Sequence, residues 1–317
     1  MNEVPGQAPG GAAHETGTCP HREHVVLGML AGLGAFFMFT CMNAFAKLLA
    51  EQHSVFEIAF YRNLIALLPF LVLIFGFGRR DLLVVHSQPR KVGGRAVLGT
   101  LTLAMTFTSY SLMPMADTTA FLFSASLFVP VLAVLFLGEP VGPWRWSAVA
   151  IGFAGVLVML RPSGDLYLLG AGVALVTALM QAVLQIILRQ IGRTERPETV
   201  SFYFFLIGTV LMALPLPFVA VRPTAAELPL LAGVGLTGAA AQWLLSTAFR
   251  HAPAVVVTVF NYSGIVWATL LGWLIWNDWP LPRVFAGAAI VIVSNLLIIW
   301  RESRRQAVTG ARAVARL

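Results

Sequence analysis

The fold is decided by the stretch PMADTTAFLFSASLFVPVLAVLFLGEP, residues 114–140, and by a later stretch that repeats its pattern, PAVVVTVFNYSGIVWATLLGWLIWNDW, residues 253–279. Aligned without a gap, the two share a proline, two hydroxyl residues and a phenylalanine: Pro114 with Pro253, Thr119 with Thr258, Phe121 with Phe260, and Ser124 with Ser263. Each copy holds about 20 apolar residues, which is enough to cross a bilayer as a helix. We interpret the pair as an internal duplication, and in a membrane protein a duplication is typical of a transporter.

The composition is that of a membrane protein. Of the 317 residues, 58% are hydrophobic and 11% are charged, whereas a soluble domain carries about 25% charged residues. The net charge of +7 would favour nucleic acid as a partner of a soluble protein, but here the basic residues lie between apolar runs. We therefore expect membrane lipid, and no nucleic acid, around this chain. Cys19 and Cys41 provide no disulfide framework.

Apolar runs occur ten times along the chain, near residues 25–49, 56–77, 95–113, 117–137, 144–160, 166–188, 199–220, 227–249, 255–276 and 282–300. Each run has about the length that a bilayer requires. Backbone polar groups in lipid must be satisfied within the segment, so runs of this length are expected to be helices. The sequence predicts an all-α integral membrane protein with ten transmembrane helices.

Lysine and arginine are concentrated in alternate connections. They gather between the second and third runs, between the sixth and seventh, and after the tenth. Basic residues favour the cytoplasmic side, so both termini are predicted to be cytoplasmic, and in a bacterium the membrane would be the inner one. Residues 1–24 are expected to form a disordered tail, and residues 301–317 a basic tail.

The first and sixth runs also align, with Asn43 and Lys47 falling on Gln185 and Arg189. The halves 25–160 and 166–300 then hold five spans each. An odd number of spans forces the second half into the membrane upside down, and in such inverted repeats the substrate site lies near the midplane.

The chain resembles the EamA-type proteins of the drug/metabolite transporter superfamily. The resemblance is carried by FYRNLIALLPFL at 60–71, by residues 119–140, by GFAGVLVML at 152–160 and by residues 252–278. It implies two five-helix EamA repeats and the export or import of amino acids, nucleotide-related metabolites, vitamins or metallophores. Asp278 stands where the family usually has glutamate.

Polar side chains within the apolar runs are the candidate binding residues, because such residues are costly in lipid and often functional. Asn43 and Lys47, like Gln181 and Gln185, lie one helical turn apart and form polar stripes. Amides and aromatic rings that face a central cavity suit a planar or amphipathic organic solute. The candidate substrate site comprises Asn43, Arg62, Phe121, Ser124, Gln181, Gln185, Gln242, Trp243, Asn261, Tyr262 and Trp267.

Each of these residues also has a structural interpretation. Amides form hydrogen bonds between membrane helices, and tryptophans mark the membrane interface. Arg62 either anchors a substrate carboxylate or braces the backbone as a structural strut.

Three charged residues are candidates for gating. Lys47 is expected near the outer mouth with Glu57 as its partner, and Arg189 near the inner mouth with Glu195 or Glu198. Alternating access needs two such closures, of which one is formed at a time. The alternative is that they snorkel to the membrane surface.

The function predicted from these features is secondary transport of a small organic metabolite by alternating access. No catalytic constellation, metal-ligand set or phosphate-binding loop is found in the sequence, so we expect neither an enzyme nor a cofactor. Two alternatives stay open: a membrane subunit with no transport of its own, and a membrane-embedded enzyme that modifies lipids. A homodimer also stays open.

Overall fold

The structure, a computed structural model, describes residues 20–137, 142–160, 165–191 and 194–314. Within these ranges every regular element is a helix, which confirms the all-helical prediction. The elements are α1 (Pro20–Leu49), α2 (Val55–Leu71), η1 (Val72–Gly76), η2 (Arg80–Leu83), α3 (Pro89–Leu112), α4 (Met115–Leu122), α5 (Ala125–Leu137), α6 (Pro143–Met159), α7 (Asp165–Ile191), α8 (Pro197–Ala213), α9 (Leu216–Val219), α10 (Leu228–His251), α11 (Ala254–Asn261), α12 (Ser263–Trp276) and α13 (Pro282–Val314).

Six helical stretches within the described residues are long and apolar enough to cross a membrane. Three further apolar helices are shorter, and they are Trp146–Met159, Pro197–Ala213 and Pro282–Ile298. Large apolar side chains such as Phe75, Leu157 and Phe218 lie exposed, at 82%, 69% and 90%. A surface of this kind is unfavourable in water and favourable in lipid, so the chain is a multi-pass membrane protein.

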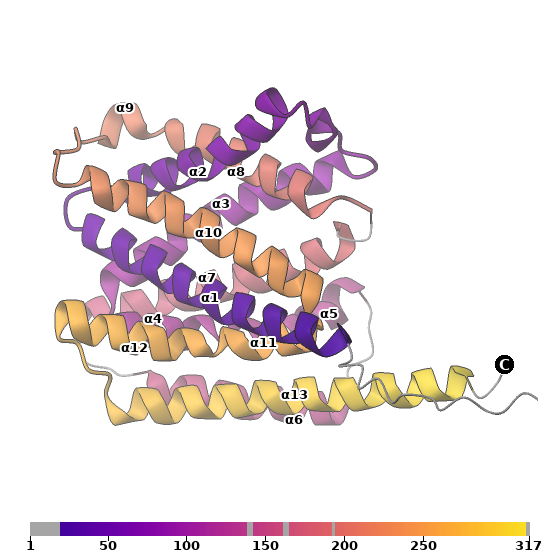
Figure 1. Cartoon of the computed structure of the whole chain (residues 1–317). Coiled ribbons are helices and arrows are strands. Elements are labelled where there is room, and N and C mark those ends of the chain that lie inside the picture. Colours follow the sequence, from indigo (N-terminus) through magenta and orange to yellow (C-terminus); the bar gives the residue numbers. More distant parts are fainter. Residues whose placement is uncertain (1–19, 138–141, 161–164, 192–193, 315–317) are drawn as a thin grey trace, which may run out of the picture.

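Helices from the first half of the chain pair with helices from the second half. The α1 helix packs along α10, α2 along α8, α3 along α7, and α6 along α13. Figure 1 shows α6 and α13 lying side by side along one face, below the row that contains α11 and α12. The interface between the halves therefore runs through the middle of the bundle.

Glycines allow the closest of these contacts. A Cβ atom built on Gly155 of α6 would lie 2.8 Å from the backbone oxygen of Gly287, and one on Gly287 would lie 2.5 Å from the oxygen of Gly155. Small residues let membrane helices approach to backbone contact. Any larger side chain at either position would push α6 and α13 apart.

Two of the helical stretches are broken at equivalent positions. One break, at Phe123 and Ser124, separates α4 from α5, and the other, at Tyr262, separates α11 from α12. At the first break the Ser124 hydroxyl donates to the carbonyl oxygen of Phe121 (2.6 Å), and at the second the Ser263 hydroxyl donates to that of Phe260 (2.7 Å). Serine hydroxyls satisfy backbone groups that a broken membrane helix would leave unpaired. These are the residues that the two copies share.

Candidate functional site

A cavity of about 410 Å³ lies between the two halves of the chain. It is lined by residues of α1 to α5 from the first half and of α7, α8 and α10 to α12 from the second, whereas no described residue of α6 or α13 lines it. The two helix breaks meet at its wall, where the rings of Phe123 and Tyr262 contact edge to face with centroids 5.2 Å apart.

Seven of the predicted binding residues line this cavity. They come from five helices and from the break between α11 and α12, and are Asn43, Arg62, Gln181, Gln185, Gln242, Asn261 and Tyr262. The sequence could point to these residues because a polar side chain within an apolar run is costly in lipid and faces protein or water instead.

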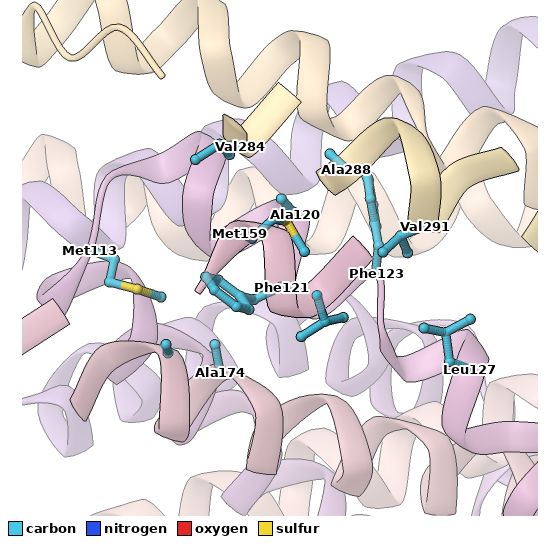
Figure 2. Close-up of a cluster of buried hydrophobic side chains, with 12 residues drawn as sticks. Met113, Ala120, Phe121, Phe123, Leu127, Met159, Ala174, Val284, Ala288 and Val291 are labelled. Atoms are coloured by element: carbon cyan, nitrogen blue, oxygen red, sulfur yellow. The ribbon is translucent and has the colours of Figure 1, made fainter. Parts of the chain in front are cut away.

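Four other predicted residues lie outside the cavity. Phe121 is fully buried in a cluster with Met113, Met159 and Val284, as Figure 2 shows. Ser124 is also fully buried, and its hydroxyl is turned to the backbone at the helix break. The prediction placed both on the cavity because it treated residues 114–140 as one continuous helix.

The two tryptophans among these four lie elsewhere for different reasons. Trp243 is 69% exposed on the outside of α10, where lipid would surround it. Trp267 packs edge to face on Phe37 of α1, with ring centroids 5.0 Å apart. The structure thus places one tryptophan on the outer surface of the bundle and the other between α12 and α1.

The residues that sequence reasoning missed are hydroxyls, one arginine and several rings. Tyr110 forms a hydrogen bond of 3.0 Å with the hydroxyl of Thr119 at the cavity wall. Arg95 of α3, Ser126 of α5 and Phe204 of α8 also line it. Arg95 stands at the very start of the apolar run at 95–113, whereas α3 begins earlier, at Pro89, and carries Arg95 into the bundle.

Near the end of α1, one turn beyond Asn43 of the cavity wall, Lys47 contacts the ends of α3 and α12. Its Nζ donates to the carbonyl oxygen of Met113 (3.0 Å) and lies 3.9 Å from Oδ2 of Asp278 and 4.8 Å from the ring centroid of Trp276. Asn277, in the left-handed region at φ 57°, ends α12, and the following Asp278 N–H donates to the carbonyl of Gly272 (3.1 Å). This helix terminus holds Asp278 beside Lys47.

Glu57 is not the partner of Lys47 in this structure. Its Oε2 lies 3.1 Å from Nδ1 of His53 and accepts a hydrogen bond from the Val221 N–H (3.3 Å). The same histidine lies 3.2 Å from Glu227 through Nε2. Burial lowers the pKa of His53, but the two carboxylates more than offset this and the net shift is upward. The contact joins the α1–α2 connection to the segment before α10.

The expected inner partners of Arg189 are engaged elsewhere. The Glu195 carboxylate accepts from the backbone N–H groups of His86, Ser87 and Gln88, at 2.9, 2.7 and 3.0 Å, and these bonds lower its pKa to about 2. Glu198 lies 3.6 Å from Arg250. Arg189 lies in the last turns of α7, and its side chain is outside the described part of the structure.

Asp117 is a buried carboxylate that sequence reasoning overlooked. It is 5% exposed in α4, and its Oδ2 accepts a hydrogen bond from the Tyr167 hydroxyl (3.2 Å). Its signal was available, since it stands three residues after Pro114 in the stretch on which the fold depends.

The family of the chain follows from sequence comparison. A family model described as EamA-like transporter family matches residues 26–161 and again residues 168–300. The chain belongs to the EamA-like transporter family. The two EamA matches fall on the two halves whose helices pair across the cavity.

Several curated EamA relatives are similar to the chain over most of its length. It is 30% identical over 276 residues to the pseudopaline exporter CntI of Pseudomonas aeruginosa, covering 86% of this chain and 95% of the relative. It is 32% identical over 215 residues to a riboflavin transporter of Rhizobium johnstonii (67% and 70%), and 29% identical over 282 residues to an S-adenosylmethionine uptake transporter of Rickettsia bellii (86% and 94%).

A solved crystal structure shares the EamA fold of this chain. It matches with a TM-score of 0.61 at 18% identity, covering 87% of this chain and 98% of the other. The curated relatives, by their names, are transporters of metabolites. Among the described residues of this chain, no group of three metal-ligating side chains lies together.

Proposed function

We propose that this EamA protein carries a small organic metabolite across the membrane by alternating access, with the central cavity as the binding site. The observation that carries the proposal is the cavity itself, which is walled by residues of both halves and lies where their helices pair. A site between two repeats can open to either side when one repeat rocks against the other.

The relatives support an organic solute and leave its identity open. Their names cover pseudopaline, riboflavin and S-adenosylmethionine, which are three chemically different metabolites. Amides and aromatic rings in a cavity suit an organic solute, and Asn43, Gln181, Gln242, Asn261 and Tyr262 provide them here.

In this proposal the chain spans the membrane ten times. The spans are α1, α2, α3, the pair α4–α5, α6, α7, α8, α10, the pair α11–α12, and α13. Five spans fall in residues 25–160 and five in 166–300, so the second half is inverted and both termini are cytoplasmic. The basic residues at 79–91, at 193–196 and after residue 300 support this orientation.

The gating proposal keeps Lys47 and assigns it a different partner. Lys47 closes the outer end by joining α1 to Asp278 and to the Met113 carbonyl, which lie on opposite halves of the chain. Glu57, at the start of α2, contacts His53, which in turn contacts Glu227 of the second half, so this set of contacts also joins the halves. Arg189 is proposed as the inner counterpart, with a partner other than Glu195, whose oxygens bind backbone N–H groups.

The test is transport by the purified full chain in proteoliposomes. Vesicles with and without protein are incubated with a metabolite extract, and the solutes taken up are identified by mass spectrometry. We expect at least one solute to accumulate only with protein, and Gln185→Leu combined with Tyr262→Leu to slow it at least tenfold. The control is Trp243→Leu, a change to the same residue on the outer surface of the bundle, and it should leave the transport rate unchanged. Protein that is folded and inserted but moves no solute would contradict the proposal.

A further inference from the structure

The charges that line the central cavity are both positive. Arg62 of α2 and Arg95 of α3 carry them, and no aspartate or glutamate is among the described residues that line the cavity. We propose that the cavity takes an organic anion, whose carboxylate or phosphate group binds between Arg62 and Arg95. The inference rests on the proposed function and names the substrate class of that same site.

Arg62 is enclosed by the protein, and only part of the hydrogen-bonding capacity of its guanidinium group is used. It is 2% exposed, its Nη1 donates to Oδ1 of Asn63 (2.9 Å), and its Nε has no hydrogen-bond partner. Its Cζ lies 5.4 Å from the ring centroid of Phe204 and 5.1 Å from that of Phe205. Buried charges are normally paired with an opposite charge, and no described carboxylate lies within ion-pair distance of Arg62.

Arg95 repeats this situation from a different helix. Its Cζ lies 4.5 Å from the centroid of the same Phe204 ring, and its buried Nε and Nη1 have no hydrogen-bond partner. Gly99, one turn along α3, allows the Phe204 ring to lie close, since a Cβ atom there would come within 3.0 Å of it. The ring thus fixes both guanidinium groups at the cavity wall.

Two fixed guanidinium groups without counter-charges favour an anionic ligand. A guanidinium presents its N–H donors in a planar fork that matches a carboxylate or phosphate in pairs. Such an anion would satisfy the unpaired donors of Arg62 and Arg95 and neutralise their charge. A cationic solute would meet repulsion from both. The rest of the molecule would face the rings of Phe36, Phe123 and Tyr262, so an aromatic or other planar acid fits best.

The alternative is that the arginines only brace the helices. In that case the ring contacts and the Asn63 bond are their whole role, and the charge of a solute would have little effect on binding. The two interpretations differ in what happens when one charge is removed from the ligand or from the protein.

Binding to the detergent-purified full chain is measured by equilibrium dialysis with mass spectrometry. The probes are two matched pairs, isophthalate with isophthalamide, and flavin mononucleotide with riboflavin. The first pair tests a carboxylate and the second a phosphate, so the pair with the larger preference identifies the acidic group. We expect at least one anion to bind about tenfold to a hundredfold more tightly than its neutral partner.

Variants assign that preference to the two residues. Arg95→Gln should abolish it, while Arg90→Gln, the same change at an exposed position of α3, should leave it intact. Because Arg62 is enclosed, it is replaced by lysine, which keeps the positive charge but lacks the planar pair of N–H donors. In Arg62→Lys the preference for the anionic probe should fall several-fold. Thermal unfolding confirms that each variant is folded.

Three results would overturn the proposal: neutral probes binding as tightly as the anions, no probe binding at millimolar concentration, or a preference that survives Arg95→Gln. Transport of the same probes separates this inference from the proposed function. Uptake of riboflavin but not of flavin mononucleotide or isophthalate would leave transport standing and reject the anion site. Charge-dependent binding without any transport would leave the anion site standing and reject the proposed function.

Discussion

Replacing Lys47 by methionine should open the outer end of the protein. The methionine keeps an unbranched apolar stem, lacks the ammonium group and so removes three contacts. These are the charged hydrogen bond to Met113, worth about 1.5–3 kcal/mol, the cation–π contact with Trp276, about 0.5–1 kcal/mol, and the pair with Asp278, whose 41% exposed carboxylate limits it to about 0.2–1 kcal/mol.

The loss should favour the outward-open state by about 2 kcal/mol or more, which is about a 30-fold change in population. The assay is the rate at which a membrane-impermeant thiol reagent, added outside, modifies a cysteine at Asn43, one turn below Lys47 on α1 and at the cavity wall. The background lacks Cys19 and Cys41. Lys47→Met should raise the rate about 30-fold, and Asp278→Asn no more than about fivefold.

The order of these two effects is the sharper part of the prediction. Lys91→Met, the same change at an exposed lysine of α3, is the control and should leave the rate unchanged. Equal effects of Lys47→Met and Asp278→Asn would show that the ion pair, and not the Met113 carbonyl, holds the closure. No effect of Lys47→Met would refute the gate.

Three further predictions concern stability and topology. Gly155→Val should destabilise the protein by about 1–3 kcal/mol by separating α6 from α13, whereas Gly172→Val, with open space around it, should not, as thermal unfolding in detergent would show. Protonated His53 should stabilise the fold below its ordinary pKa of about 6.5, and the gain should disappear as the pH rises through its raised pKa, so His53→Gln should lower the melting temperature more at about pH 6 than at about pH 9. Single cysteines at Gln52 and Thr194, both exposed, should be labelled from outside and from the cytoplasm respectively.

Each of these has a clear contrary result. A Gly155 variant as stable as the wild type would mean that α6 and α13 do not depend on backbone contact. A His53→Gln loss that grows with pH would reverse the assigned sign. Labelling of both cysteines from the same side would contradict the ten-span topology.

The helical membrane fold and the family could be predicted from the sequence, because apolar runs of bilayer length leave few alternatives. The alignment of residues 114–140 with 253–279 also identified two stretches that occupy equivalent positions in the two halves. What could not be predicted was the break in each of them, since Ser124 and Ser263 are compatible with a continuous helix until their hydroxyls are seen to bond to the preceding turn. For that reason the shared Phe121 and Ser124 were assigned to the cavity.

The candidate site was predictable in part and for a definable reason. Amides such as Gln181 and Asn261 stand out in apolar runs, and the structure places them at the cavity. Contacts between distant segments gave no such signal, so Lys47 was paired with the nearby Glu57 and not with Asp278. The contact between His53 and Glu227 gave no signal in the sequence either, because the two residues lie far apart along the chain.

The central claim is that the cavity between the halves is the transport pathway, and a single cysteine at Ser126 tests it most directly. Ser126 lies at the wall beside the helix break. In oriented proteoliposomes, with Cys19 and Cys41 replaced, we predict that an impermeant thiol reagent modifies this cysteine from either side of the membrane, that a transported solute slows the reaction, and that modification stops transport. Modification from one side only, or unimpaired transport by fully modified protein, would contradict the claim.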